Sequence, residues 1–289
     1  MASTQQLKSR IRSVDNTRQI TKAMELVAAS KMRKAQDSSK ATDLYSQTAR
    51  ELLTYLSQQN DIAMHPLFKK RTIKKRLLIV ITSDKGLAGA YNTNIMKKYT
   101  QALKEDDAAG ILSETIAIGR KGSQFVTRIK DTEIVGAYHD FADKPTGNEV
   151  KPIISSAMDK FLNGDVDAVD VIYTEYVNSM TQNAVIERIL PAGFVKTDSI
   201  EESVRLANFE PSSDAVLEGA AKRLIEAQLF QALLDAKASE YSMRMVAMKN
   251  ATDNATDLSN DLTLEMNKVR QAAITQELAE ISGGAEAVA

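Results

Sequence analysis

Glycine and proline, the residues that most often break helices, are almost absent from both ends of this chain. Among its 289 residues, the first 63 contain neither type, and residues 212–282 contain no proline and only Gly219. All five prolines and most of the twelve glycines lie between these two stretches. Because glycine and proline punctuate helices, the sequence predicts a long helix over residues 1–63, a folded middle over 64–210 and a second long helix over 211–289.

The first predicted helix begins at a capping box, in which Ser3 and Gln6 each satisfy a free backbone N–H of the first turn. Apolar residues then recur at helical spacing. They are Leu7, Ile11, Val14, Ile20, Met24, Val27 and Met32. The polar stretch 15–19 interrupts this stripe, so we do not expect one continuous apolar partner along it.

The last predicted helix has Ser212 or Ser213 as its N-cap and ends at Ile281, before a Ser-Gly-Gly sequence. One face carries residues at alternating spacings of three and four, which is the pattern of a coiled-coil seam. The seam comprises Met248, Ala251, Ala255, Leu258, Leu262, Glu265, Val269, Ala272, Gln276 and Ala279. It is thin, because Ala, Glu and Gln stand where Leu or Ile would stabilise a coiled coil most.

Length predicts that these helices form a rod. At a rise of 1.5 Å per residue, ~70 helical residues span ~105 Å. A compact globule of this chain length is only about 50 Å across. No loop able to fold either helix back is visible, so we expect a rod rather than a bundle.

Charge predicts that the two helices pair with each other. Residues 1–76 hold 16 Lys and Arg against 6 Asp and Glu, whereas residues 200–289 hold 8 against 15. Opposite charge favours association of the two helices over self-pairing of either. Because one enters and the other leaves the same middle part, they would run antiparallel. Solvation of each charged face is the alternative interpretation.

The middle of the chain alternates strands and helices, which is typical of an α/β layer domain. Arg76–Ser83 is an apolar, β-branched run of the kind found in buried parallel strands. We expect further strands at Glu114–Ile118, Ala168–Val177 and Ala184–Leu190, and helices at about 92–104, 123–130 and 149–162. The predicted fold is therefore a long antiparallel coiled coil of the N- and C-terminal helices plus a small α/β, Rossmann-like globular domain.

Two glycine-containing turns leave a ligand-binding interpretation open. Gly86–Asn92 follows a strand and precedes a helix, where phosphate-binding loops lie. It lacks both the dinucleotide fingerprint and the Lys-Ser/Thr pair of a P-loop. Gly119–Gly122 is similar. A structural strand-to-helix turn is the favoured interpretation of both, and a ligand loop is the alternative.

Two charged clusters have simple interpretations. Asp165, Asp167 and Asp170 have metal-like spacing but lack the loop glycine and terminal glutamate of a calcium site, so we expect no metal there. The basic run Lys69–Arg76 has Phe68 as its one aromatic neighbour. A solvated linker or a surface for an acidic partner is favoured over a nucleic-acid or anionic-membrane patch.

Composition excludes several function classes. A net charge of -1 argues against a dedicated nucleic-acid binder. The absence of cysteine excludes a disulfide scaffold, a thiolate zinc site and a thiol nucleophile. Two histidines leave little for a metal site or a catalytic triad. The longest apolar run, Leu77–Ile81, is far short of the ~20 residues of a membrane span, and no signal peptide is visible. We therefore expect a soluble, cytosolic chain.

Segments at both ends and in the middle resemble the γ subunit of rotary ATP synthases. They are Leu7–Val14, Asn16–Lys34, Ser83–Asn92, Arg244–Asn254 and Asn267–Leu278. They occur in the expected order, and the resemblance covers the whole chain. It implies a non-catalytic central rotor shaft of a proton-translocating ATP synthase. The coiled coil would lie inside a hexamer of α and β subunits, and the α/β domain would lie at the foot, against the ε subunit and the membrane c ring.

The resemblance also implies contacts at particular residues. Near β subunits it would place Arg270, Gln271 and Thr275 at the upper shaft, and Met24 and Lys85 beside an acidic segment. Phe209 and Glu210 would contact the c ring at the foot. No catalytic, cofactor, nucleotide or metal site is expected on this chain. It would lie at the cytoplasmic side of the cell membrane, peripheral and attached only through the complex.

Two functions from different classes follow. The first is this rotary shaft, which couples rotation of the c ring to ATP synthesis and hydrolysis at the catalytic sites of the β subunits. The alternative is a nucleotide-binding α/β enzyme with helical arms, which rests on the turn at Gly86.

Overall fold

A computed structural model describes residues 3–58, 66–130, 132–143, 145–192 and 213–288 of the chain. In chain order the elements are α1 (Thr4–Gln58), β1 (Lys75–Ile81), α2 (Tyr91–Ala109), β2 (Leu112–Ile118), α3 (Arg120–Val126), β3 (Glu133–Tyr138), α4 (Gly147–Asn163), β4 (Ala168–Tyr176), β5 (Gln182–Leu190) and α6 (Ser213–Val288). The chain forms two compact units, one of residues up to Ala28 with those from Arg244 onward, the other of Ala29–Met243.

The two terminal helices are each continuous, as the scarcity of helix breakers predicts. The capping box at the start of α1 is confirmed, because Ser3 N donates to Gln6 Oε1 at 3.0 Å and Gln6 N donates to Ser3 Oγ at 3.2 Å. The predicted end of the last helix at Ile281 is wrong, since α6 continues through both glycines to Val288. A glycine permits a helix to end but does not force it to.

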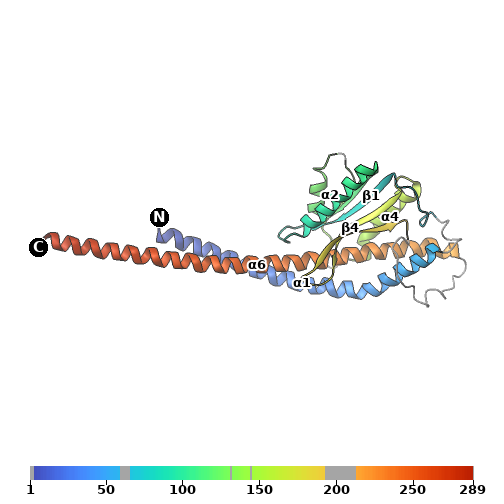
Figure 1. The fold of residues 1–289 in the computed structure, drawn as a ribbon. Helices are drawn as coiled ribbons and strands as arrows, with labels where there is room; N and C mark the ends of the chain where they lie inside the picture. Colours follow the sequence, from blue (N-terminus) through green and yellow to red (C-terminus); the bar gives the residue numbers. More distant parts are fainter. Residues whose placement is uncertain (1–2, 59–65, 131, 144, 193–212, 289) are drawn as a thin grey trace. The chain divides into compact units, whose positions relative to one another are not determined.

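In the first unit, α1 and α6 lie side by side and antiparallel (Figure 1). Thr252 Oγ1 donates to Thr21 Oγ1 at 2.8 Å, and Ser259 Oγ donates to Asp15 Oδ1 at 3.2 Å. Later residues of α6 therefore pair with earlier residues of α1, as antiparallel helices require. On each helix the buried residues lie seven or fourteen positions apart, as in a coiled coil. They are Leu7, Thr21 and Ala28 on α1, and Met248, Ala255 and Leu262 on α6.

This strict repeat corrects part of the predicted seams. Ile20 and Val27 are 61% and 56% exposed, because the seven-residue repeat places Thr21 and Ala28 in the contact instead. On α6, Leu258 is 46% exposed. The contact between α1 and α6 follows a single seven-residue repeat. After Val14, the apolar residues Ile20 and Val27 each lie one position before a buried position of that repeat.

The second unit is built on a five-stranded sheet of order β3-β2-β1-β4-β5. The first four strands are parallel and β5 pairs antiparallel with β4. The strands β1, β2, β4 and β5 confirm those expected from the sequence, within two residues at each end. Strand β3 was not predicted, because it is short, partly exposed and contains Gly136, which makes it weak in strand signal.

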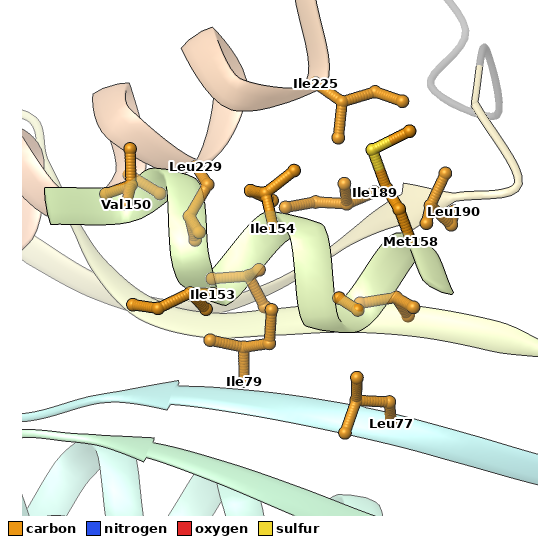
Figure 2. Packing of buried hydrophobic residues seen from close by; sticks show 14 of the residues in the cluster. Leu77, Ile79, Val150, Ile153, Ile154, Met158, Ile189, Leu190, Ile225 and Leu229 are labelled. Atoms are coloured by element: carbon orange, nitrogen blue, oxygen red, sulfur yellow. The ribbon is translucent and has the colours of Figure 1, made fainter. Parts of the chain in front are cut away.

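Helices cover both faces of this sheet, which explains why β1 is apolar throughout. Leu78 and Val80 face α2 and α3, whereas Leu77, Ile79 and Ile81 face α4 and the long helices. Figure 2 shows α4 between the two layers, with Ile153 toward Ile79 of β1 and Ile154 toward α6. The sheet and the long helices therefore share one hydrophobic core in this unit.

Candidate functional site

The strand order reverses between β1 and β4, and in doubly wound sheets ligands bind outside the carboxyl ends of the strands at this point. The turn that contains Gly86 lies there, between β1 and α2. Its polar groups bond within the protein. Ser83 N donates to Asn92 Oδ1 at 3.1 Å, Ser83 Oγ donates to Lys85 O at 2.7 Å, and Asn92 Nδ2 donates to Ser83 Oγ at 2.8 Å. The turn is thus held closed by its own side chains.

A carboxylate of the protein bonds the backbone at the start of α3. Asp84 Oδ1 accepts from Arg120 N, the first residue of α3, at 3.1 Å, and Asp84 Oδ2 accepts from Asp140 N at 3.2 Å. Free N–H groups at the start of a helix attract phosphate, and here Asp84 already bonds one of them. Arg120 Nη2 also donates to Asp140 Oδ2 at 2.6 Å, and this bond lowers the pKa of Asp140.

The two glycines of the 119–122 turn serve close packing. A Cβ at Gly119 would lie 2.2 Å from the Thr82 carbonyl oxygen, and one at Gly122 would lie 2.7 Å from Thr82 Oγ1. Thr82 Oγ1 accepts from Gly122 N at 2.8 Å and donates to Ile118 O at 2.9 Å. These contacts fit the favoured interpretation of a structural turn.

Helix α6 lies over the same edge of the sheet. Leu233, Ala236, Lys237 and Glu240 of α6 line the cavity beside Thr82, and this cavity has a volume of about 10 Å³. A cavity of this size holds about one water molecule at most, so a nucleotide does not fit. The crevice that binds ligands in related folds is filled here by the protein's own helix.

The residues expected at the upper shaft lie together near the end of α6. Arg270, Gln271 and Thr275 are exposed, as is every residue of 270–282. Thr275 Oγ1 donates to Gln271 O at 2.9 Å within the helix, so it adds no bond to α1. This end of α6 offers its whole circumference to a partner.

An apolar stripe on the same end was not singled out from the sequence. Ile274, Leu278 and Ile281 are 49%, 62% and 69% exposed, at spacings of four and three that place them on one face. That spacing was a readable signal. It was missed because the heptad assignment selected the neighbouring face, which contains Ala272 and Gln276.

The other expected contact residues lie in different places. Met24 is half-buried on α1, and Leu26 beside it is 61% exposed. Lys85 is exposed in the β1–α2 turn, close to Leu87, which is 62% exposed at a φ of 62°. A non-glycine residue in this left-handed region is strained, and such strain clusters at functional sites. Phe209 and Glu210 lie outside the described residues.

The charged clusters of the sequence have structural partners. Arg188 Nη2 donates to Asp170 Oδ2 at 3.0 Å, and Asp167 Oδ2 accepts from Lys74 N at 2.8 Å. Within the basic run, Arg76 Nη1 lies 3.2 Å from Asp106 Oδ1. Across the described ranges, no group of three acidic, histidine or cysteine side chains is arranged to hold a metal, and no helix is long and apolar enough to cross a membrane.

Comparison with known sequences matches the whole chain. Residues 3–288 match the family model described as ATP synthase. A curated relative named ATP synthase gamma chain, from Cupriavidus pinatubonensis, is 42% identical over 292 residues. Another with that name, from Polaromonas naphthalenivorans, is 42% identical over 290 residues. Both comparisons cover 100% of this chain and 100% of the relative.

Solved structures share the fold. A chain of the Euglena gracilis mitochondrial ATP synthase (OSCP/F1/c-ring, rotational state 3) aligns with a TM-score of 0.74 and 21% identity, over 99% of this chain and 94% of that one. A chain of the central stalk and c ring of the Tetrahymena thermophila enzyme aligns with a TM-score of 0.62 and 24% identity, over 80% and 99%.

Proposed function

Because this chain belongs to the family of ATP synthase gamma chains, we propose that it is the central rotor shaft of a proton-translocating ATP synthase. The observation that carries the proposal is full-length similarity at 42% identity, which spans both long helices and the α/β domain. The shaft couples rotation of the membrane c ring to ATP synthesis and hydrolysis at sites on other subunits.

The hexamer of α and β subunits surrounds the end of α6. Two observations support this placement. Residues 270–282 are exposed on all sides of the helix, and Ile274, Leu278 and Ile281 form an exposed apolar stripe there. Exposed apolar patches mark interaction sites. Arg270, Gln271 and Thr275 contact a loop of β there. Apolar contacts are non-directional, so they hold the end centred without fixing one rotational position.

Met24 of the first unit and Lys85 of the second unit each contact β as well. The exposed apolar neighbours Leu26 and Leu87 support these contacts, together with the positive charge of Lys85 opposite an acidic segment of β. At the foot, Phe209 and Glu210 contact the c ring, and the ε subunit binds the α/β domain. The chain is thereby peripheral to the cell membrane, on its cytoplasmic side.

Catalysis belongs to the β subunits. The filled crevice beside Thr82 and the bond from Arg120 N to Asp84 support a shaft without a nucleotide site of its own. The nucleotide-binding enzyme is therefore not favoured. An asymmetric shaft changes the affinity of each β site as it turns, because each orientation presents a different face of the helix pair. No one orientation can be bound too tightly, or rotation would stop there.

Reconstitution tests the proposal directly. Cognate α and β subunits are mixed with and without this chain, and steady-state ATP hydrolysis and the size of the product are measured. We expect a stable hexamer that holds one copy of the chain and hydrolyses ATP faster than α and β alone. If the chain neither associates with α and β nor changes their turnover, the shaft assignment is refuted.

A further inference from the structure

Two loops at the carboxyl edge of the sheet each hold both long helices within the second unit. The edge loop, residues 139–143, follows β3. The hairpin, residues 176–182, joins β4 to β5. Since β3 and β5 are the two outer strands of the sheet, the loops come from opposite sides of it.

In the edge loop, a single carboxylate bridges the two helices. Lys31 Nζ of α1 lies 2.7 Å from Asp143 Oδ2, and the Tyr241 hydroxyl of α6 donates to Asp143 Oδ1 at 2.5 Å. Lys31 Nζ also lies 5.6 Å from the centre of the Tyr241 ring. The Lys31 and Tyr241 bonds lower the pKa of Asp143, which keeps this acceptor ionised.

The hairpin contacts the same two helices. Gln36 of α1 donates from Nε2 to the Tyr176 hydroxyl. On α6, Ser242 Oγ donates to Ser179 O at 3.0 Å and accepts from Gln182 Nε2 at 3.2 Å. These four contacts form a clamp, in which each of the two loops bonds each of the two helices.

The geometry of this clamp resists rolling and sliding of the helices. Consecutive helical residues point about 100° apart, so Tyr241 and Ser242 hold α6 from two directions. Hydrogen bonds weaken steeply as their angle or length departs from the optimum. Outside the clamp, Ser239 Oγ of α6 also donates to Thr174 O at 3.1 Å and Lys237 Nζ donates to Phe141 O at 3.5 Å. Much of the other contact between the long helices and the sheet layer is apolar, through residues such as Leu53, Ile225 and Leu229. Apolar burial is non-directional and opposes a small roll far less.

We propose that this clamp transmits twist between the long helices and the α/β domain, with Asp143, Tyr241 and Ser242 as positioning residues. The inference rests on the proposed shaft function, in which torque must pass from the foot to the helices. Without the clamp, the domain would still pack on the helices, but the helices would lag behind the domain as the foot drives them.

The test measures torsional stiffness in the assembled complex. The hexamer is fixed to a surface and stalled, and a particle is attached to the α/β domain through Leu112→Cys. This position is 69% exposed, and the thiol is unique on the chain. The paired substitution Tyr241→Phe with Ser242→Ala removes two hydroxyls and little volume. We expect the variance of the particle's angle to rise by up to about twofold, because variance is inversely proportional to stiffness and two of the four clamp contacts are lost.

A matched control separates this effect from a general loss of side-chain bonds. Tyr45→Phe with Ser38→Ala makes the same chemical change on α1 outside the clamp, where Tyr45 is 56% exposed and Ser38 Oγ donates to Lys34 O within the helix. The control should keep the variance of the native sequence. Equal variance in the clamp variant and the control, at equal ATP hydrolysis, would overturn the proposal.

If the double variant does not assemble, Tyr241→Phe and Ser242→Ala are measured singly, and each should raise the variance by less than the pair. A single variant that assembles and leaves the variance unchanged counts against the clamp. Failure of the native chain to assemble with α and β counts instead against the shaft function, so the two inferences fail separately.

Discussion

The carboxyl group of Asp235 lies between the two long helices in the second unit. Ser39 Oγ donates to its Oδ1 at 2.6 Å and Gln231 Nε2 donates at 3.1 Å. Burial raises the pKa of Asp235 from 3.8 to about 6, the charges of Asp43 and Glu175 add to the rise, and the two hydrogen bonds oppose it. A buried carboxylate at neutral pH is destabilising for this helix contact.

We expect Asp235→Asn to stabilise the chain above pH 7 by about 1–3 kcal/mol. The native state binds the Asp235 proton more tightly than the unfolded chain does. The stability that the chain gains from the protonated Asp235 is therefore complete below about pH 4, and it is lost as the pH rises through about 6. Thermal unfolding of both chains between pH 4 and 8 checks this. The gain should vanish at pH 4. Asp37→Asn, an exposed change on α1, is the matched control, and its free energy of unfolding should stay within about 0.5 kcal/mol of that of the native chain.

Gly119 is the residue at which a side chain is least compatible with the fold. Its φ is +94° and an added Cβ would lie 2.2 Å from the Thr82 backbone oxygen. We expect Gly119→Ala to lower the free energy of unfolding by about 3 kcal/mol or more, from strain and overlap together. Gly110→Ala is the matched control, since Gly110 has φ +69° but nothing within 4 Å of the added Cβ. Its cost should be about 1 kcal/mol. Equal losses in denaturant unfolding would refute the packing argument.

At the scale of elements, the end of α6 differs from the rest of the first unit. Up to about Val269 the helix buries a face against α1, whereas residues 270–282 are exposed on all sides. Such a segment is stabilised within the chain only by its own helical bonds, and isolated helices of this length are marginal in water. The sequence at this end is therefore free to serve a partner rather than the fold.

We expect Arg270→Ala with Thr275→Ala to reduce ATP hydrolysis by the reconstituted complex several-fold while the melting temperature of the isolated chain stays within about 2 °C. The matched control is Thr127→Ala with Arg128→Ala. Thr127 makes the same bond to the carbonyl four residues earlier, and both residues are exposed near the end of α3. Parallel losses of stability and activity in the Arg270 and Thr275 variant would contradict a contact role.

At the scale of the whole molecule, a sheet of the ligand-binding type has its crevice filled by a helix from the far end of the chain. Leu233, Ala236 and Glu240 of α6 line a small cavity there together with Thr82. The α/β domain thus packs against the long helices where related folds bind a ligand. This agrees with the rule that a fold does not by itself imply a function.

The isolated chain should therefore not bind ATP. We expect calorimetry with ATP and magnesium to show no saturable heat at nucleotide concentrations up to about 1 mM, a range that detects any site with a free energy of binding beyond about -4 kcal/mol. A micromolar dissociation constant that Gly86→Val abolishes would restore the ligand-loop interpretation of the β1–α2 turn.

Much of the architecture follows from local sequence. The capping box at Ser3, the two uninterrupted helices and the apolar strand β1 depend on neighbouring residues, so they can be read without long-range contacts. The contact of Arg270, Gln271 and Thr275 with β rests on the resemblance to the family, and it stays a prediction. Strand β3 could not be read in this way, since its pairing with β2 supplies what its own sequence lacks.

By itself, the sequence determined that two long helices flank an α/β domain, because helix propensity and hydrophobic period act over a few residues at a time. Only the tertiary structure decided which face each helix buries, since the seven-residue repeat placed Thr21 and Ala28 in the contact and left Ile20 and Val27 outside. It alone also brought Asp143 to Lys31 and Tyr241, and α6 to Thr82. These contacts join residues about 100 to 160 positions apart, and a contact between such distant residues depends on how the whole chain packs.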